Sequence, residues 1–301
     1  MFNFLDKIRE APAFYRQLAL DRQLITEFNC PLESKKETIW TDQSYFVYVL
    51  EGTKIWHIPD KAFELKQGQC LFVKKGAHII EQVFDTTFCL IVFFISDNFI
   101  ANTLGNHQLQ EPVSANGSMP VISYIHTDNS LHAFFNSIAT YFMDYQKVNT
   151  DLLELKFREL ILNVINDPHN KEVTSYFHSL TANNHGETMR KILEENFQYN
   201  LRIENYARLC GRSLSAFKRD FETYFKTTPG KWLLARRLQH ARILIHTSEK
   251  SISEIAFESG FENSSHFSRA FKQYYGYPPT DARRIQHDLL SKDFELSGNL
   301  R

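Results

Sequence analysis

The last third of the chain carries one spacing of apolar residues twice. Each copy opens with a short amphipathic run, IENYARLC or SISEIAFES, whose apolar positions fall on one face of a helix. A glycine follows, Gly211 or Gly260, and it can take the left-handed backbone conformation that ends a helix. Aromatic residues then recur every four positions, at Phe217, Phe221 and Phe225 in the first copy and at Phe267, Phe271 and Tyr275 in the second. This repeat indicates one supersecondary unit used twice, and each unit predicts two helices joined by a tight turn.

The second helix of each unit presents a polar outer face, because its aromatic residues pack toward the first helix. Ser213 and Ser264 are the predicted N-caps of these helices. One such face alone favours an ordinary solvated helix, but two copies with the same turn chemistry favour a pair of helix-turn-helix units that enter the DNA major groove. The residues predicted to contact bases or phosphates are Ser213, Ser215, Lys218, Arg219, Asn263, Ser264, Ser265, His266, Arg269 and Lys272.

A continuous helical pattern, PGKWLLARRLQHARILIHTS, joins the two units. Pro229 suits the first helical position, and apolar residues then recur to Ile245 without a helix breaker. An eighteen-residue helix is about 27 Å long. This length is compatible with two recognition helices in successive major grooves, about 34 Å apart.

Short β-rich runs dominate the chain from Tyr45 to Ile95: YFVYVLEG, TKIWHI, AFELKQG, QCLFVKKG, IIEQVF and TTFCLIVFFI. Turn residues separate them, which predicts an antiparallel β-barrel or sandwich. The opening segment FLDKIREAPAFYRQLAL has helical spacing instead. Residues 101–127 are rich in Gly, Pro, Asn and Ser and predict a loop.

Two amphipathic helices are predicted over residues 129–147 and 151–166. Their apolar stripes either cover the barrel or form a dimer interface, and the pattern does not choose between these roles. The candidate dimerisation residues are Leu152, Leu155, Leu160 and Ile161. Residues 167–186 are interpreted as a polar linker. We therefore predict an α+β protein of two domains, with a regulatory and dimerisation barrel plus appended helices over residues 1–166 and an all-α double helix-turn-helix over residues 187–290.

Charge is distributed unevenly along the 301 residues. The formal net charge is −1, yet residues 187–290 hold 17 Lys and Arg against 12 Asp and Glu, a local charge of +5 that leaves −6 for the remainder. A basic end on an acidic body fits nucleic-acid binding by one domain.

The spacing of the cysteines argues against redox or zinc chemistry. Cys30, Cys70, Cys89 and Cys210 contain no CxxC pair. The chain opens without a charged and then apolar leader, and its apolar runs stay well short of the roughly eighteen residues that a membrane span needs. We expect a cytoplasmic protein without a membrane partner.

The C-terminal residues resemble the AraC/XylS-type transcriptional regulators. The resemblance is carried by the second unit, IAFESGFENSSHFSRAFKQYYGYPP, and by the connector PGKWLLARRLQHA. It implies an activator that binds double-stranded promoter DNA, works with RNA polymerase and forms a homodimer through helices that follow the barrel. YVLEG followed by KQGQCLFVKKGAH resembles the family's cupin-like sensor domain. Lys226 stands where the family usually has a glycine, so the first recognition helix is expected to end less sharply.

A cupin-like barrel could be an enzyme, so its metal ligands matter. Metal-binding cupins supply closely spaced histidines and a glutamate, whereas the candidates here are His57, His78 and Glu81, and Lys74 replaces the usual proline. We therefore predict no catalytic residue, no metal site and no cofactor. Two alternatives stay open: a metal-dependent cupin enzyme with an accessory DNA-binding module, and a non-sensing interaction protein. The sequence also leaves open whether the barrel senses a small molecule or a protein partner.

Overall fold

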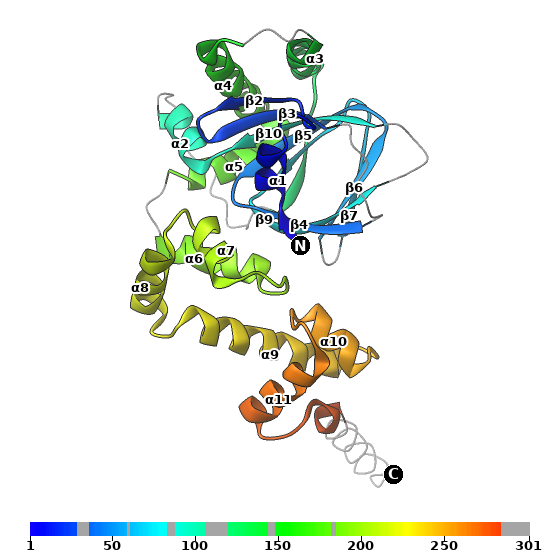
Figure 1. Cartoon of the computed structure of the whole chain (residues 1–301), viewed down its shortest axis with the longest axis vertical. Coiled ribbons are helices and arrows are strands. Elements are labelled where there is room, and N and C mark those ends of the chain that lie inside the picture. Colours follow the sequence, from blue (N-terminus) through cyan, green and yellow to red (C-terminus); the bar gives the residue numbers. More distant parts are fainter. Residues whose placement is uncertain are drawn as a thin grey trace, which may run out of the picture. The chain divides into compact units, whose positions relative to one another are not determined.

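The computed structural model describes residues 1–28, 36–58, 61–82, 88–105, 120–143, 148–181 and 185–283. The chain divides into two compact units, an N-terminal unit over residues 1–184 and a C-terminal unit from residue 185 onward (Figure 1). Cys30 and residues 284–290 of the predicted double helix-turn-helix domain lie outside the described residues. Among the described helices, none has the length and apolar character needed to cross a bilayer.

Two β-sheets form the frame of the N-terminal unit. One has the strand order β1-β4-β9-β6-β7 and the other the order β11-β8-β5-β10-β3-β2. The ladders are antiparallel except for the short β1–β4 pair. The strands are β1 (Phe2–Asn3), β2 (Gln17–Leu20), β3 (Gln23–Phe28), β4 (Lys36–Thr41), β5 (Ser44–Glu51), β6 (Thr53–Ile58), β7 (Lys61–Lys66), β8 (Cys70–Val73), β9 (Gly76–Gln82), β10 (Cys89–Ile95) and β11 (Ile122–Ile125). The predicted antiparallel, cupin-like architecture is confirmed, with the two sheets as separate ladders rather than a closed barrel.

Apolar side chains fill the space between the two sheets. Phe4, Leu5 and Ile8 come from α1 (Phe4–Glu10), which lies in the opening between the sheets (Figure 1). The helix stops there because Pro12 has no amide hydrogen and disfavours helical geometry in the residue before it. The prediction of one longer opening helix is therefore wrong, since the chain continues into β2.

Helices cover the outer face of the six-stranded sheet. They are α2 (Asp97–Gly105), α3 (Asn129–Met143), α4 (Thr150–Asn166) and α5 (Lys171–Ser179). Their apolar residues share one core with strand residues such as Phe46 and Phe93. Because this sheet is covered on both faces, the sequences of its central strands are nearly continuous apolar runs. The loop predicted over residues 101–127 has regular structure near both ends. At its start α2 extends to Gly105, and toward its end β11 pairs with β8.

The dimerisation candidates on α4 fall into two groups. Leu160 and Ile161 have no exposed surface and pack in the core under the sheet, so their prediction as dimerisation residues is wrong. An amphipathic stripe identifies the buried face of a helix, and here the sheet buries it. Leu152 and Leu155, in contrast, are 51% and 59% exposed.

The predicted linker at residues 167–186 is largely a structured part of the N-terminal unit. The turn η1 (Pro168–Asn170) leads directly into α5. Val173 and Phe177 lie four residues apart on α5 and are both buried in the core. The boundary between the units falls after residue 184, so the linker prediction is wrong for η1 and α5.

The C-terminal unit is built mainly from helices. They are α6 (His185–Asn196), α7 (Ile203–Leu209), α8 (Leu214–Phe225), α9 (Pro229–Thr247), α10 (Ile252–Glu258) and α11 (Ser264–Tyr275). α7 with α8 and α10 with α11 form the two predicted helix-turn-helix units, and α9 joins them. The 19 residues of α9 span about 28 Å. The prediction of an all-α double helix-turn-helix is confirmed.

Candidate nucleic-acid interface

The first helix-turn-helix turns at Gly211, whose φ is +66°. Its amide donates to the Arg208 carbonyl oxygen at 2.8 Å and closes the end of α7. Ser213 then caps α8, because its hydroxyl accepts from the Ala216 amide at 3.3 Å. The capping prediction for Ser213 is therefore confirmed.

The second unit repeats this turn with a different cap. Gly260 has a φ of +86°, and the next amide, that of Phe261, donates to the Ala256 carbonyl oxygen at 3.0 Å. Asn263 caps α11 by accepting from the His266 amide at 2.7 Å. Ser264 is the first helical residue, so its prediction as the cap is wrong by one position. Asn is as good a cap as Ser, and its extended backbone satisfies the same requirement.

The end of α8 also differs from expectation. Lys226 takes the left-handed conformation, with φ +55° and ψ +27°, and its amide donates to the Glu222 carbonyl oxygen at 3.0 Å. The helix therefore ends as sharply as one closed by glycine. The cost of placing a side-chain residue in this conformation is about 1–2 kcal/mol.

The aromatic residues face the interior of each unit, as their spacing predicts. Phe217 and Phe221 on α8, and Phe267 and Phe271 on α11, have no exposed surface. The stripe continues to Phe225, whose ring centroid lies 4.4 Å from that of Phe221. Both second helices are thus fixed by one face, and their polar faces point to solvent.

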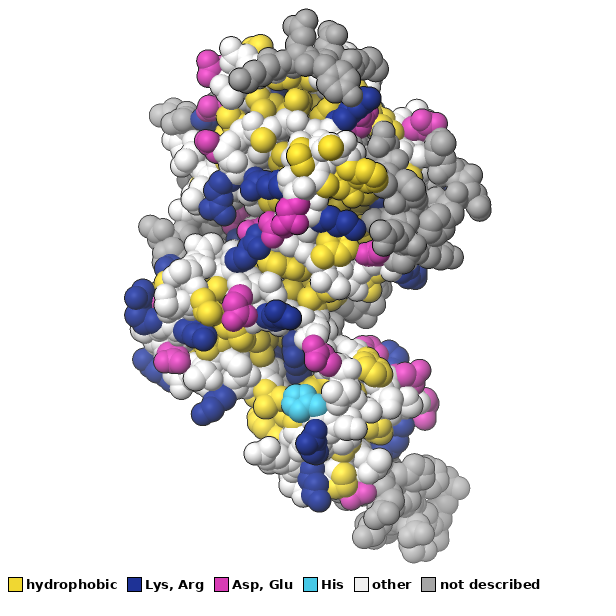
Figure 2. All heavy atoms as spheres, viewed as in Figure 1, with side chains coloured by type: hydrophobic (Ala, Val, Ile, Leu, Met, Phe, Trp, Pro, Cys, Tyr) yellow, Lys and Arg dark blue, Asp and Glu magenta, His cyan; other side chains and the backbone are white. Residues whose placement is uncertain are grey.

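These outer faces carry the predicted DNA-contact residues. Ser264 is half-buried at the start of α11, whereas the other nine are exposed: Ser213, Ser215, Lys218, Arg219, Asn263, Ser265, His266, Arg269 and Lys272. Figure 2 shows Lys and Arg side chains gathered over the region of α8, with a further group near α11. The structure therefore brings these residues together on two surfaces, one for each unit. Their contact with DNA stays a prediction.

A carboxylate organises the arginines at α8. Asp220 lies 2.9 Å from the guanidinium of Arg212 and 3.3 Å from that of Arg219. The side chain of Arg219 is 74% exposed, and an ion pair at such a position contributes little stability. Arg219 can therefore exchange this partner for a phosphate or a base edge.

Arg237 ties α9 to the segment between α6 and α7 and is a residue that the sequence analysis missed. Its guanidinium donates to the carbonyl oxygens of Phe197 at 2.8 Å and Tyr199 at 2.9 Å, in the chain between α6 and α7. Gly260 packs against the same segment, because a β-carbon added there would lie 2.8 Å from the Phe197 carbonyl oxygen. The turn of the second helix-turn-helix thus packs against the segment that leads into α7. Neither contact has a signal in the spacing of residues, since the partners are far apart in the sequence.

The barrel residues considered as metal ligands lie on opposite faces of the five-stranded sheet. The imidazole of His57 is 2.7 Å from the carboxylate of Glu81 and partly exposed. His78 points inward, where it is fully buried and hydrogen-bonded to the Tyr45 hydroxyl. Burial lowers the pKa of His78 to about 3. These three side chains therefore cannot ligate one ion.

Two family models match the chain: the ExsA N-terminal regulatory domain over residues 44–176 and a helix-turn-helix domain over residues 206–285. The virulence regulon transcriptional activator VirF of Yersinia enterocolitica is 23% identical over 236 residues, which cover 78% of this chain and 87% of that protein. The HTH-type transcriptional regulator ExsA of Pseudomonas aeruginosa is 23% identical over 262 residues, which cover 79% and 94%. A crystal structure of the apo K231A variant of ToxT from Vibrio cholerae aligns with 86% of this chain and 96% of its own, at 14% identity and a TM-score of 0.43.

The matched domains coincide with the two units of the fold. The regulatory model covers most of the two-sheet unit, and the helix-turn-helix model runs from α7 through α11. The relatives align across both units rather than over the C-terminal unit alone. The chain is therefore an AraC-type, DNA-binding transcriptional regulator, with an ExsA-type regulatory domain ahead of a double helix-turn-helix domain.

Proposed function

We propose that this protein is a cytoplasmic transcription activator that binds a two-part promoter site with α8 and α11 in successive major grooves and assists RNA polymerase there. One observation carries the proposal: two capped helices with exposed basic outer faces are joined by α9, which Arg237 ties to the segment ahead of α7. A relative of the same architecture is named as a transcriptional activator. The N-terminal unit would then regulate this activity.

Removing either exposed arginine should weaken the binding of selected sites. We expect Arg219→Ala and Arg269→Ala each to lower affinity for the protein's own promoter by about 1–3 kcal/mol if the side chain reads a base. Titration of the full-length protein in mobility-shift experiments, at one fixed salt concentration, measures the change. Lys250→Ala is the matched control, because Lys250 is also exposed but is ion-paired with Glu258 outside both recognition helices.

The pattern of losses decides what each arginine does. A loss confined to promoter DNA assigns the arginine to base readout, and an equal loss on unrelated DNA assigns it to phosphate contact. If both variants bind promoter DNA as tightly as the Lys250→Ala control does, the outer faces of α8 and α11 do not form the interface.

We further propose that the protein dimerises through the start of α4. Leu152 and Leu155 lie one turn apart on its surface and are both more than half exposed. Leu155→Asp should give a folded monomer by light scattering, whereas Leu234→Asp, at an exposed leucine of α9, should leave the oligomeric state unchanged. Leu160→Asp should instead unfold the N-terminal unit, because it buries a charge without a partner. A wild-type protein that is monomeric at all concentrations, both free and on DNA, would refute this interface.

The packing of α1 favours a protein partner over a small molecule as the effector. Phe4, Leu5 and Ile8 occupy the space between the sheets together with large barrel residues such as Tyr45 and Trp56. A metabolite in that space would first have to displace these side chains. A protein partner can act on the outer surface without this cost.

A further inference from the structure

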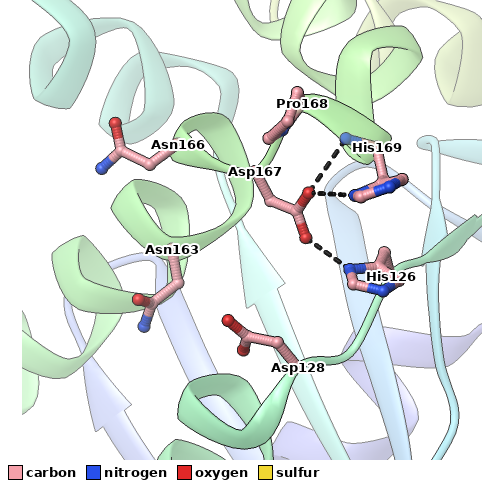
Figure 3. Close-up of a pocket in the computed structure, with 7 residues that line it drawn as sticks. All are labelled: His126, Asp128, Asn163, Asn166, Asp167, Pro168 and His169. Atoms are coloured by element: carbon pink, nitrogen blue, oxygen red, sulfur yellow. Dashed lines mark hydrogen bonds and ion pairs between the residues drawn. The ribbon is translucent and has the colours of Figure 1, made fainter.

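Two histidines share one carboxylate on the surface of the N-terminal unit. The Nδ1 atoms of His126 and His169 lie 2.6 Å and 2.8 Å from the two carboxylate oxygens of Asp167. Figure 3 shows both imidazoles turned toward this carboxylate from two separate segments of the chain. His126 follows β11, whereas Asp167 and His169 belong to the junction of α4 and η1.

Hydrogen bonds fix the segments that carry these three residues. Asp167 caps η1 by accepting from the His169 amide at 2.9 Å. The His126 amide donates to the side-chain oxygen of Asn170 at 2.8 Å, and Asn170 is itself buried and bonded to the Val164 carbonyl oxygen. The fold therefore fixes the backbone of all three residues, and hydrogen bonds to Asp167 orient the two imidazoles.

Two imidazoles and a carboxylate form a ligand set that suits zinc. The nearest ligand atoms of the three residues all lie within 4.8 Å of one another. A tetrahedral zinc ion with bonds of about 2.0–2.1 Å holds its ligand atoms roughly 3.3 Å apart, so the imidazole of His126 would have to move away from Asp167 by about 0.7 Å and that of His169 by about 0.5 Å. The side chain of His169 is 69% exposed and has room for this movement. Each Nδ1 then offers its lone pair once the ring proton moves to Nε2.

The surroundings leave space for an ion with further ligands. A cavity of about 340 Å³ lies beside the three residues and is also lined by Asp128 and Asn163. Asp128 caps α3 by accepting from the Leu131 amide at 2.8 Å, and its carboxylate lies on the cavity side in Figure 3. A water molecule in this cavity can supply the fourth ligand.

We propose that His126, Asp167 and His169 bind one zinc ion per chain. The ion would join the segment that leads into α3 to the junction between α4 and α5. This site differs from the cupin-type position at His57, His78 and Glu81, and it belongs to the N-terminal unit, whereas the DNA-contact residues belong to the C-terminal unit. The prediction of no metal site considered only the barrel strands.

Zinc titration of the full-length, chelator-treated protein tests this proposal. We expect isothermal titration calorimetry to show one saturable site per chain and zinc, but not magnesium, to raise the unfolding temperature. His126→Gln and His169→Gln should each weaken binding at least about tenfold. His57→Gln is the matched control, because the His57 imidazole also lies 2.7 Å from a carboxylate, that of Glu81, but through Nε2 and at a position that the proposed site does not use.

The histidine variants also distinguish zinc binding at this site from zinc binding by the cysteine thiols. His169 is exposed, so its replacement should leave folding intact. The absence of saturable zinc binding in the wild-type protein would overturn the proposal. Zinc binding that persists unchanged in the His126→Gln/His169→Gln double variant would overturn it equally, because the ion would then be held elsewhere.

Discussion

Gly260→Ala is expected to destabilise the C-terminal unit by about 3 kcal/mol or more, because two costs combine. The residue has a φ of +86°, which costs a side-chain residue about 1–2 kcal/mol. Its β-carbon would also lie 2.8 Å from the Phe197 carbonyl oxygen and 2.9 Å from that of Gln198. Both contacts are with backbone, so relief requires the turn of the second helix-turn-helix to move away from the segment between α6 and α7.

Gly276→Ala is the matched control for this experiment. Gly276 has the same φ of +86°, but nothing lies within 4 Å of the position its β-carbon would take. Urea unfolding of both variants therefore separates the conformational cost from the cost of the close contact. Promoter affinity should also fall more for Gly260→Ala, because the spacing of α8 and α11 changes. Equal stability and equal DNA affinity of the two variants would show that the close contact at Gly260 does not hold the second helix-turn-helix in place.

The N-terminal unit is expected to lose about 2–3 kcal/mol of stability between pH 6.5 and pH 4.5 through His78. In the unfolded chain this histidine takes up a proton near its ordinary pKa of about 6.5. In the folded protein burial lowers the pKa to about 3, so the ring stays neutral. Between these values the unfolded state binds more protons, and stability falls as the pH falls by up to about 1.4 kcal/mol for each pH unit.

His78→Gln isolates this contribution, because glutamine does not titrate. Unfolding measured across the same pH range should show a shallower slope for the variant, even if the variant is less stable throughout through loss of the Tyr45 hydrogen bond. His266→Gln removes an exposed histidine of the other unit and should leave the slope unchanged. A slope for His78→Gln equal to that of the wild type would exclude His78 as its source.

Local patterns predicted the C-terminal unit well. A glycine at the turn, a cap and an aromatic residue on every turn of α8 and α11 are all signals within a few residues of one another. The exceptions have local causes too. Asn263 rather than Ser264 caps α11, because either side chain can accept a hydrogen bond from a free amide of the first helical turn. Lys226 took a left-handed conformation although its side chain disfavours it, because the chain must turn there before Pro229 begins α9.

Contacts between distant segments could not be predicted in this way. The apolar stripe on α4 predicted that Leu160 is buried. The helical period of that stripe does not show whether a sheet or a second copy of the chain buries the residue. Arg237 and Gly260 owe their roles to a segment that lies well before them in the sequence. The candidate zinc site could not be predicted for the same reason, since the fold alone brings His126 next to Asp167.

Chemical footprinting of the full-length protein on its own promoter tests the central claim most directly. Two protected major-groove segments should appear on one face of the DNA, with centres about one helical turn or 10 bp apart. Inserting about half a turn between them should abolish joint protection, because α9 and the Arg237 contacts fix the spacing of α8 and α11. A single protected segment, or two that survive the insertion unchanged, would contradict an account in which two helices held at one distance recognise the promoter.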